Sequence, residues 1–332
     1  MIKKLFVIAL VTGIAAAGAP GLRAQVKYGG YVSGEYLKGE SGSPYAGGSF
    51  QNLGAGVLAT GLFPSSPFGF SLEARFLSES SFQIEQAWVG FVSSKTFAVK
   101  AGMYLVPFGI WNQASRPHET ALIGTPLNLE FLYPASWRDL GVTVDGQYGV
   151  VTYAGYIGNG LKEADSLADG QQFSDNNKNK ALGGRLGLSL GQGVQAGASY
   201  YTGKYDDLNL RNLVLEGVDF SWVTDQWQFK GEATRGIIKN PEPFVTGKCE
   251  GYYLWTLMNF GHVQPVGSYQ KVKYTDPFHG GEGGILLDQD RWTAGVRVVL
   301  GQSLFIKAEY QWNDEIPKVK NNILLVQVAA SF

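Results

Sequence analysis

Hydrophobic and polar residues alternate along most of this chain in short segments that recur at nearly regular intervals. In one of them, Phe68, Phe70 and Leu72 share a face, and Ser71 and Glu73 share the other. A period of two places successive side chains on opposite faces of a β-strand. Sixteen such segments follow one another: 26–37, 52–62, 68–77, 82–92, 96–104, 139–148, 150–157, 181–190, 194–202, 214–223, 227–234, 251–260, 263–274, 292–300, 304–312 and 323–332. The pattern predicts an all-β chain.

The connections between these segments are sorted by length. Apart from the brief connection 78–81, every odd-numbered connection is long or of medium length, and every even-numbered one is a tight turn. Bacterial outer-membrane barrels have short turns at one membrane face and longer loops at the other. A soluble sandwich with Greek-key crossings gives no reason for such sorting. The connections therefore predict an antiparallel transmembrane β-barrel of sixteen strands, although a soluble or surface-attached β-sandwich binding module remains an alternative.

The connection 105–138 is the longest, and loops of that length are rare in compact domains and are usually functional. Counting strands makes it the third extracellular loop. We expect this loop to fold into the lumen and to narrow it, with four prolines stiffening it by fixing φ. The residues that we expect to line the constriction are Arg116, His118, Glu119, Asn128 and Glu130.

A second interpretation of the same loop gives those polar residues no special role. Its apolar residues would pack the loop against the inner wall, and the charged and amide side chains would be incidental. The apolar residues in question are Leu122, Ile123, Leu127, Leu129 and Phe131. Both interpretations can hold together. A loop that plugs the lumen would instead predict a gated, substrate-specific barrel transporter.

The faces of the predicted strands assign charged side chains to the lumen. The basic candidates are Arg75, Lys100, Arg185, Lys230, Lys271, Lys273, Arg297 and Lys307. The acidic candidates are Glu73, Glu85, Asp145, Asp219, Glu232 and Glu309. Charged rings and rows in a pore set its ion preference. A mixed lining with a slight cationic excess predicts weak selectivity, and solvation of a water-filled interior would explain the same charges.

The N-terminus predicts an export signal, and the composition excludes several classes of protein. Residues 1–24 predict a secretory signal peptide, because Lys3 and Lys4 precede an apolar run that is too short to span a membrane. Its removal would leave 24 basic and 28 acidic residues, a formal charge of −4 that is unlike a nucleic-acid binder. Cys249 is the only cysteine, so no internal disulfide forms. No later apolar run reaches 18 residues, which excludes helical spans.

The last segment ends the chain on an aromatic residue. Leu324, Val326, Val328 and Ala330 alternate out to Phe332. This ending resembles the C-terminal signature by which bacterial outer-membrane proteins are recognised by the barrel-insertion machinery. The resemblance predicts that machinery as a partner through Phe332, and lipid of the bacterial outer membrane as the surroundings.

Residues 82–111 carry a further resemblance. They combine Ala87-Trp88-Val89-Gly90-Phe91 with the segment 99–104, VKAGMY, and with Val106-Pro107-Phe108-Gly109. This run resembles the phosphate-selective porin O/P family and related bacterial porins, in which such a strand leads into the third loop. The resemblance implies a sixteen-stranded homotrimer and a preference for anions or phosphate. The arginine and lysine ladder on which that family's selectivity depends cannot be aligned to residues of this chain.

Catalytic chemistry has little support in the sequence. The three histidines, His118, His262 and His279, all lie in predicted connections, and no metal-ligand spacing is present. We therefore expect no enzymatic activity, no cofactor and no metal. The function that the sequence predicts is a porin, a passive water-filled channel for small hydrophilic solutes or ions.

Overall fold

The computed structural model describes residues 25–77, 82–164, 166–242, 246–274 and 288–332. The predicted signal peptide, 1–24, lies outside the described residues. So do the connection 78–81 and residues 275–287, which include His279.

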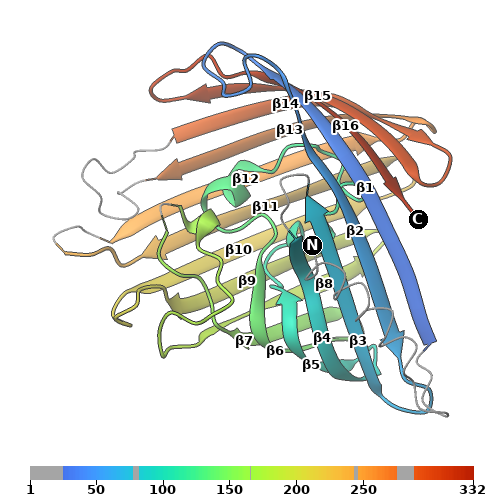
Figure 1. Ribbon diagram of the computed structural model, residues 1–332, viewed down its shortest axis with the longest axis vertical. Coiled ribbons are helices and arrows are strands. Elements are labelled where there is room, and N and C mark those ends of the chain that lie inside the picture. The colour runs from blue at the N-terminus through green and yellow to red at the C-terminus, as the bar shows by residue number, and fades with distance from the viewer. Residues whose placement is uncertain (1–24, 78–81, 165, 243–245, 275–287) are drawn as a thin grey trace, which may run out of the picture.

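Sixteen strands form one closed sheet, in which each strand is antiparallel to both of its neighbours (Figure 1). They are β1 (Gln25–Gly39), β2 (Ser49–Leu62), β3 (Phe68–Leu77), β4 (Phe82–Ser94), β5 (Phe97–Leu105), β6 (Arg138–Tyr148), β7 (Val151–Gly158), β8 (Ala181–Gly191), β9 (Val194–Lys204), β10 (Asn212–Val223), β11 (Trp227–Ile238), β12 (Gly247–Met258), β13 (Val263–Tyr274), β14 (Asp288–Leu300), β15 (Leu304–Glu315) and β16 (Ile323–Ser331). The predicted sixteen-stranded antiparallel barrel is confirmed. The sandwich alternative is wrong, because no second sheet exists among the described strands.

The barrel closes where the first strand meets the last. β1 pairs with β16 from Tyr31↔Ser331 to Gly39↔Ile323. Beyond that ladder, the N–H of Gly30 donates to the carbonyl of Phe332 at 2.9 Å, and the N–H of Phe332 donates to the carbonyl of Gly30 at 2.9 Å. A side chain at Gly30 would collide with the Phe332 ring. Closure removes the unpaired edges that an open sheet would expose.

Each strand presents one face to the barrel interior and the other to the outside. In β12, Cys249, Tyr253 and Leu257 are buried, whereas Tyr252 and Leu254 are exposed. The buried set faces inward, and the exposed apolar set forms the outer surface. Apolar side chains on the outer surface of a closed barrel are the arrangement that a bilayer requires.

A β-bulge in β4 explains an irregularity in its sequence pattern. Glu73 of β3 pairs with Gln86, but the next residue, Ala74, pairs with Ile84, so Glu85 is the extra residue. A bulge changes the alternation by one position. Gln86 and Trp88 consequently face inward. Ile84 would share their face in a regular strand, but it lies on the other side of the bulge, where the alternation has changed by one position.

Glycine is required at one close approach between strands. Gly102 in β5 has a φ of +130°. A Cβ built there would lie 2.3 Å from the carbonyl oxygen of Ala87 in β4. Both the conformation and the space disfavour any other residue.

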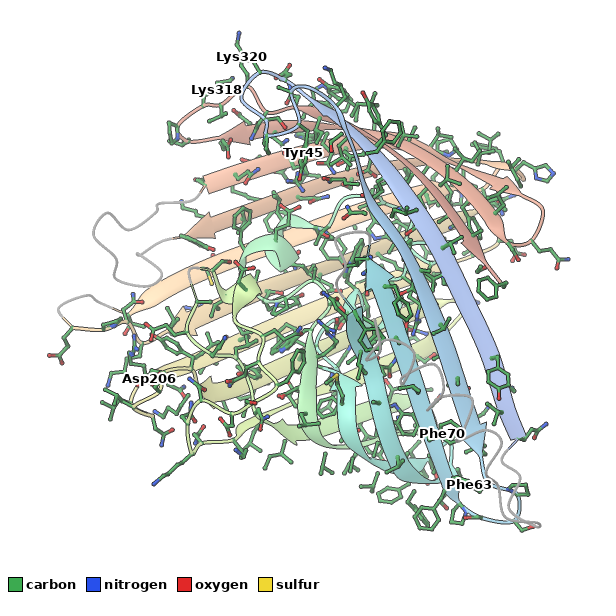
Figure 2. All side chains as sticks on the ribbon, in the orientation of Figure 1. Tyr45, Phe63, Phe70, Asp206, Lys318 and Lys320 are labelled. Carbon is green, nitrogen blue, oxygen red and sulfur yellow. The ribbon has the colours of Figure 1, made fainter. Side chains whose placement is uncertain are left out.

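The two ends of the barrel differ. Figure 2 shows Phe63 and Phe70 at the end that carries the short β2–β3 turn, with Lys318 and Lys320 on a loop at the opposite end. The rings of Phe63 and Phe70 lie 6.0 Å apart. Below, these are called the turn end and the loop end. The short helices η1 (Asn112–Ala114), α2 (Leu127–Phe131) and η2 (Leu167–Asp169) lie in loops. No helix in the described residues is long and apolar enough to cross a membrane.

Candidate channel site: the 106–137 segment and the inner wall

The 106–137 segment joins β5 to β6 and is fastened at its base. The N–H of Val106 donates to the carbonyl of Trp137 at 2.9 Å. The Asn112 amide joins the same two residues, because its Nδ2 donates to the carbonyls of Val106 and Trp137 at 2.9 and 2.8 Å. Its Oδ1 accepts from the N–H of Trp137 at 2.8 Å. Asn112 is fully buried and therefore holds the two ends of the segment together.

Glu232 of β11 anchors the first part of the segment. Its Oε1 accepts from the N–H of Ile110 at 2.7 Å and from the N–H of Trp111 at 2.5 Å. Hydroxyl groups of Tyr133 and Tyr253 donate to the same carboxylate at 3.0 and 2.8 Å. Hydrogen bonds to an ionised acceptor are stronger than those between neutral groups. A single buried carboxylate thus fixes both limbs of the segment to the wall.

Glu309 of β15 plays the same part on another side of the barrel. Its Oε2 accepts from the N–H of Ile123 at 2.8 Å, and its Oε1 accepts from the N–H of Gly124 at 2.9 Å. Between the two anchors, the N–H of Leu127 at the start of α2 donates to Oε1 of Gln270 in β13 at 3.0 Å. The segment is therefore attached to strands far apart around the barrel.

Aromatic packing fills the space between the segment and the wall. The Phe108 ring lies 5.1 Å from the Tyr133 ring, and the Trp137 ring lies 5.0 Å from that of Tyr201 in β9. Each of these four side chains is at most 1% exposed. Leu127 and Leu129 of α2 join the same buried cluster. The interpretation that apolar residues pack this segment to the inner wall is confirmed for these two leucines.

Arg116, one of the predicted constriction residues, is held by two carboxylates. Its Nε and Nη2 donate to the two carboxylate oxygens of Glu73 in β3, both at 2.7 Å. Its Nη1 donates to Glu119 at 3.1 Å. Hydrogen bonding to Glu73 raises the pKa of Arg116. Arg116 and Glu119, which were both predicted to line the constriction, thus form one ionic group with Glu73.

His118 lies between two sides of the wall. Its ring centroid is 5.3 Å from that of Tyr31 in β1, and its carbonyl accepts from Nη2 of Arg297 in β14 at 3.3 Å. The neighbouring carbonyl of Pro117 accepts from Nζ of Lys307 at 2.6 Å. Burial lowers the pKa of His118, although the nearby Glu119 opposes this shift. Partial burial therefore favours the neutral imidazole.

The two remaining constriction candidates have different surroundings. Glu130 pairs with Arg291 of β14 at 2.8 Å. Asn128 is fully buried, and its Cα and Cβ pack closely against Gly251 of β12. The expectation that Asn128 lines a constriction is wrong for this structure, because its side chain has no open space beside it.

The predicted lumenal charges largely face the interior. Lys100 pairs with Asp145 at 2.7 Å, and Arg185 pairs with Asp219 through two hydrogen bonds of 2.8 and 2.5 Å. Buried Glu85 accepts from the Ser136 hydroxyl at 2.6 Å. Arg75, Lys230 and Arg297 form no ion pair with a carboxylate among the described residues.

Lys271 and Lys273 are exceptions, since they lie on the outer face of β13. Ser268, Gln270 and Val272 form its buried inner face. Lys271 instead reaches Asp288 and Asp290 at 3.3 and 3.0 Å, beside the exposed Trp292. The prediction was wrong because the 106–137 segment packs on β13. The inner face of that strand is therefore apolar at Val266 and Val272, so the rule of polar side chains inside fails.

Several buried polar side chains at strand starts were not predicted as candidate site residues. Arg291 was placed in a connection, but β14 begins at Asp288 and carries Arg291 on its inner face. Arg138, at the start of β6, donates to the carbonyl of Ile84 at 2.9 Å. Asp139 accepts from the N–H groups of Asn159 and Gly160 at 3.0 and 2.9 Å. Continued alternation beyond the predicted starts is the signal that could have identified Arg291.

The described residues contain no group of three or more histidine, cysteine, aspartate or glutamate side chains placed to hold a metal ion. The chemistry of the interior is that of hydrogen bonds and ion pairs between the segment and the wall.

Solved structures with the same architecture place this barrel among known proteins. OmpF of Salmonella typhi superposes with a TM-score of 0.69 at 13% identity, covering 94% of this chain and 98% of that one. The anion-selective porin of Comamonas acidovorans has a TM-score of 0.67 at 14% identity, covering 93% and 100%. The fold is that of the outer-membrane porins. The in-vitro folded OmpT of Vibrio cholerae, in its trimer form, has a TM-score of 0.67 at 12% identity, covering 93% and 99%.

Comparison of sequences says less about this chain than comparison of structures does. No family model matches the chain. An uncharacterised protein of Aquifex aeolicus is 25% identical over 174 residues, which are 48% of this chain. The match spans only 39% of that relative's own length. A sixteen-stranded barrel whose neighbours are mostly porins points to a bacterial outer membrane. The specific resemblance to the phosphate-selective O/P family is not confirmed.

Proposed function

We propose that this protein is a non-enzymatic outer-membrane porin, a passive channel for small hydrophilic solutes whose 106–137 segment folds into the lumen and narrows it. The observation that carries the proposal is the attachment of this segment to inward-facing side chains of strands far apart around the barrel. Glu73, Glu232, Gln270 and Glu309 all hold it. A segment fixed at these points crosses the interior and divides the path of any solute.

We further propose a preference for anions. The inward-facing carboxylates of Glu232, Glu309 and Asp139 are occupied by main-chain N–H groups of the loops. Arg75 and Lys230, by contrast, retain charges that no described carboxylate pairs at ion-pair distance. Unpaired charge next to the path acts on a passing ion more strongly than charge within a pair. The fold shared with an anion-selective porin is consistent with this preference.

We also propose a homotrimer in the outer membrane, since a neighbour of the same fold has a trimer form. Insertion would use the terminal strand and Phe332, whose main chain completes the closure with β1. The homotrimer and the role of Phe332 in insertion are both expectations from the sequence.

One observation favours a second candidate function, a barrel that is closed at rest and opens for a particular solute. The segment is held by buried carboxylates and by a buried aromatic cluster that includes Phe108, Tyr133 and Trp137. Such fastening on several sides favours a narrow or closed path. Near-zero conductance at rest would support this candidate over the open porin.

The test is single-channel recording of detergent-purified protein in a planar bilayer, followed by the zero-current potential in a KCl gradient. We expect stable conductance steps and a potential with the sign of anion preference. The triple variant Arg75→Gln, Lys230→Gln, Arg297→Gln should move the potential toward cations. Lys248→Gln is the matched control, because Lys248 lies exposed on the outer face of β12. Absence of steps from correctly folded protein would refute the porin, and an unmoved potential would refute the anion preference.

A further inference from the structure

A cavity of about 440 Å³ lies between the 106–137 segment and the turn end of the barrel. Its lining includes Trp88, Lys100 and Lys230 from strand positions near the short turns, together with Pro107 and Gln113 of the segment. The volume is within the range of roughly 300–1,000 Å³ that small-molecule sites occupy. Space of this size beside the constriction is where a permeating solute would pause.

Among the described residues that line the cavity, one charged side chain has no ion-pair partner. Lys100 is paired with Asp145 at 2.7 Å, and Arg185 is paired with Asp219 at 2.5 Å. Lys230 has no described carboxylate at ion-pair distance, and its Nζ lies 5.6 Å from the centroid of the Trp255 ring. The charged side chains of the described lining and their ion-pair partners therefore sum to one positive unit, which fits a monoanion.

The rest of the polar lining is neutral and rich in both donors and acceptors. It includes the amide and hydroxyl side chains of Gln86, Gln113, Gln195, Thr143, Thr152 and Ser221. The Gln86 amide donates to Glu73, and the Gln113 amide donates to the carbonyls of Leu105 and Val106, so these two offer the cavity mainly their acceptor oxygens. Amides and hydroxyls can each donate and accept, so they match the hydroxyl groups of a polyol in any orientation. A simple inorganic anion would use only their donors, whereas a polyol uses donors and acceptors together.

An aromatic wall completes the site. Trp88 and Tyr104 both line the cavity, and Nζ of Lys100 lies 5.1 Å from the centroid of the Trp88 ring. An indole offers a large, rigid apolar surface with a polar edge. The C–H face of a sugar ring can pack on such a surface while its hydroxyls reach the amides.

We propose that this cavity is a binding subsite for a monoanionic sugar acid, a pyranose ring that carries one carboxylate. The carboxylate pairs with Lys230, the ring packs on Trp88, and the hydroxyls meet the glutamine, threonine and serine side chains. Binding is weak enough for release, as conduction requires. The inference rests on the proposed function, because it names the solute class that the channel takes.

The first test measures current block by sodium glucuronate in planar bilayers, with glucose and sodium acetate as comparison solutes. We expect concentration-dependent block by glucuronate at lower concentration than by either comparison solute. Lys230→Gln should weaken glucuronate block roughly ten- to hundredfold, as for loss of a hydrogen bond to a charged group, and should leave glucose unaffected. Trp88→Leu should weaken both sugars, with Trp88→Phe as the milder variant if Trp88→Leu fails to fold. Lys248→Gln should change nothing.

A second measurement separates this inference from the proposed function. Isothermal titration calorimetry of the detergent-purified barrel reports glucuronate binding whether or not the protein conducts. Binding that depends on Lys230 without any conductance would refute the porin and keep the subsite. Conductance with no preference for glucuronate over glucose and acetate, in either measurement, would keep the porin and overturn the subsite.

Discussion

Replacing Glu309 by glutamine tests whether the 106–137 segment sets the size of the channel. One carboxylate oxygen of Glu309 accepts from Ile123 N–H at 2.8 Å, and the other accepts from Gly124 N–H at 2.9 Å. Glu309 is only 3% exposed, so water does not easily replace it. A glutamine keeps one acceptor oxygen and presents an NH₂ group to the other N–H. The variant therefore loses one hydrogen bond to a charged group.

The lost bond weakens the attachment of the segment by about 1.5–3 kcal/mol. Each 1.4 kcal/mol is a factor of about ten, so the population of detached segments should rise roughly ten- to hundredfold. In single-channel records, Glu309→Gln should show frequent transitions to a larger conductance that are rare in the unmodified protein. Glu216→Gln is the matched control, because it makes the same chemical change on an exposed, outward position of β10.

Heat-modifiable migration on SDS gels checks that each variant forms the barrel. If folded Glu309→Gln has the conductance and noise of the unmodified protein, the segment does not set the channel size through this contact. If the double variant with Glu232→Gln is also unchanged, the reasoning is refuted altogether, because both carboxylate anchors would then have been weakened without consequence.

Three further predictions concern the same interior. Arg291→Gln leaves Glu130 without its cation, so the zero-current potential should move toward cations, whereas an unmoved potential would remove this pair from the path. Burial lowers the pKa of His118, so the neutral imidazole stabilises the docked segment. This stabilisation is complete above about pH 6.5 and is lost as pH falls through the lowered pKa. Channel noise should rise in acid and should not do so in His118→Gln. Gly102→Ala places a Cβ 2.3 Å from the Ala87 carbonyl oxygen and should lower the free energy of unfolding by about 1–3 kcal/mol. The measurement is the urea midpoint of barrel unfolding, which should fall; an unchanged midpoint would contradict the close approach.

The sixteen strands could be predicted from the sequence because two independent constraints act on every strand. A strand in a barrel must alternate, and each must end in a turn or a loop on the correct side. The segments 139–148 and 214–223 agree closely with β6 and β10. Starts on the loop side were less accurate, since β12 begins at Gly247 rather than at residue 251. Alternation continues there among polar residues, which carry no hydrophobic signal.

The inward face of a strand could not always be predicted, because the interior is not uniformly polar. On β5, Ala98 and Lys100 face inward as expected, and Lys100 lines the cavity. On β13, Val272 is fully buried and faces inward, because the 106–137 segment packs on that side. The rule that inward-facing side chains are polar assumes water inside the barrel. Where protein takes the place of water, the inward-facing side chains are apolar instead. Only the position of the segment reveals which strands those are.

Ion preference is the property that composition predicts least, because a count of charges does not show which of them are held in contacts within the fold. The whole chain has a formal charge of −1. Yet Glu232 and Glu309 each accept two main-chain hydrogen bonds from the 106–137 segment, so both carboxylates hold the fold rather than meet a solute. Lys230, which no described carboxylate pairs at ion-pair distance, faces the cavity instead. The formal charge therefore counts acids that do not face a solute, since the 106–137 segment uses them as acceptors for its own N–H groups.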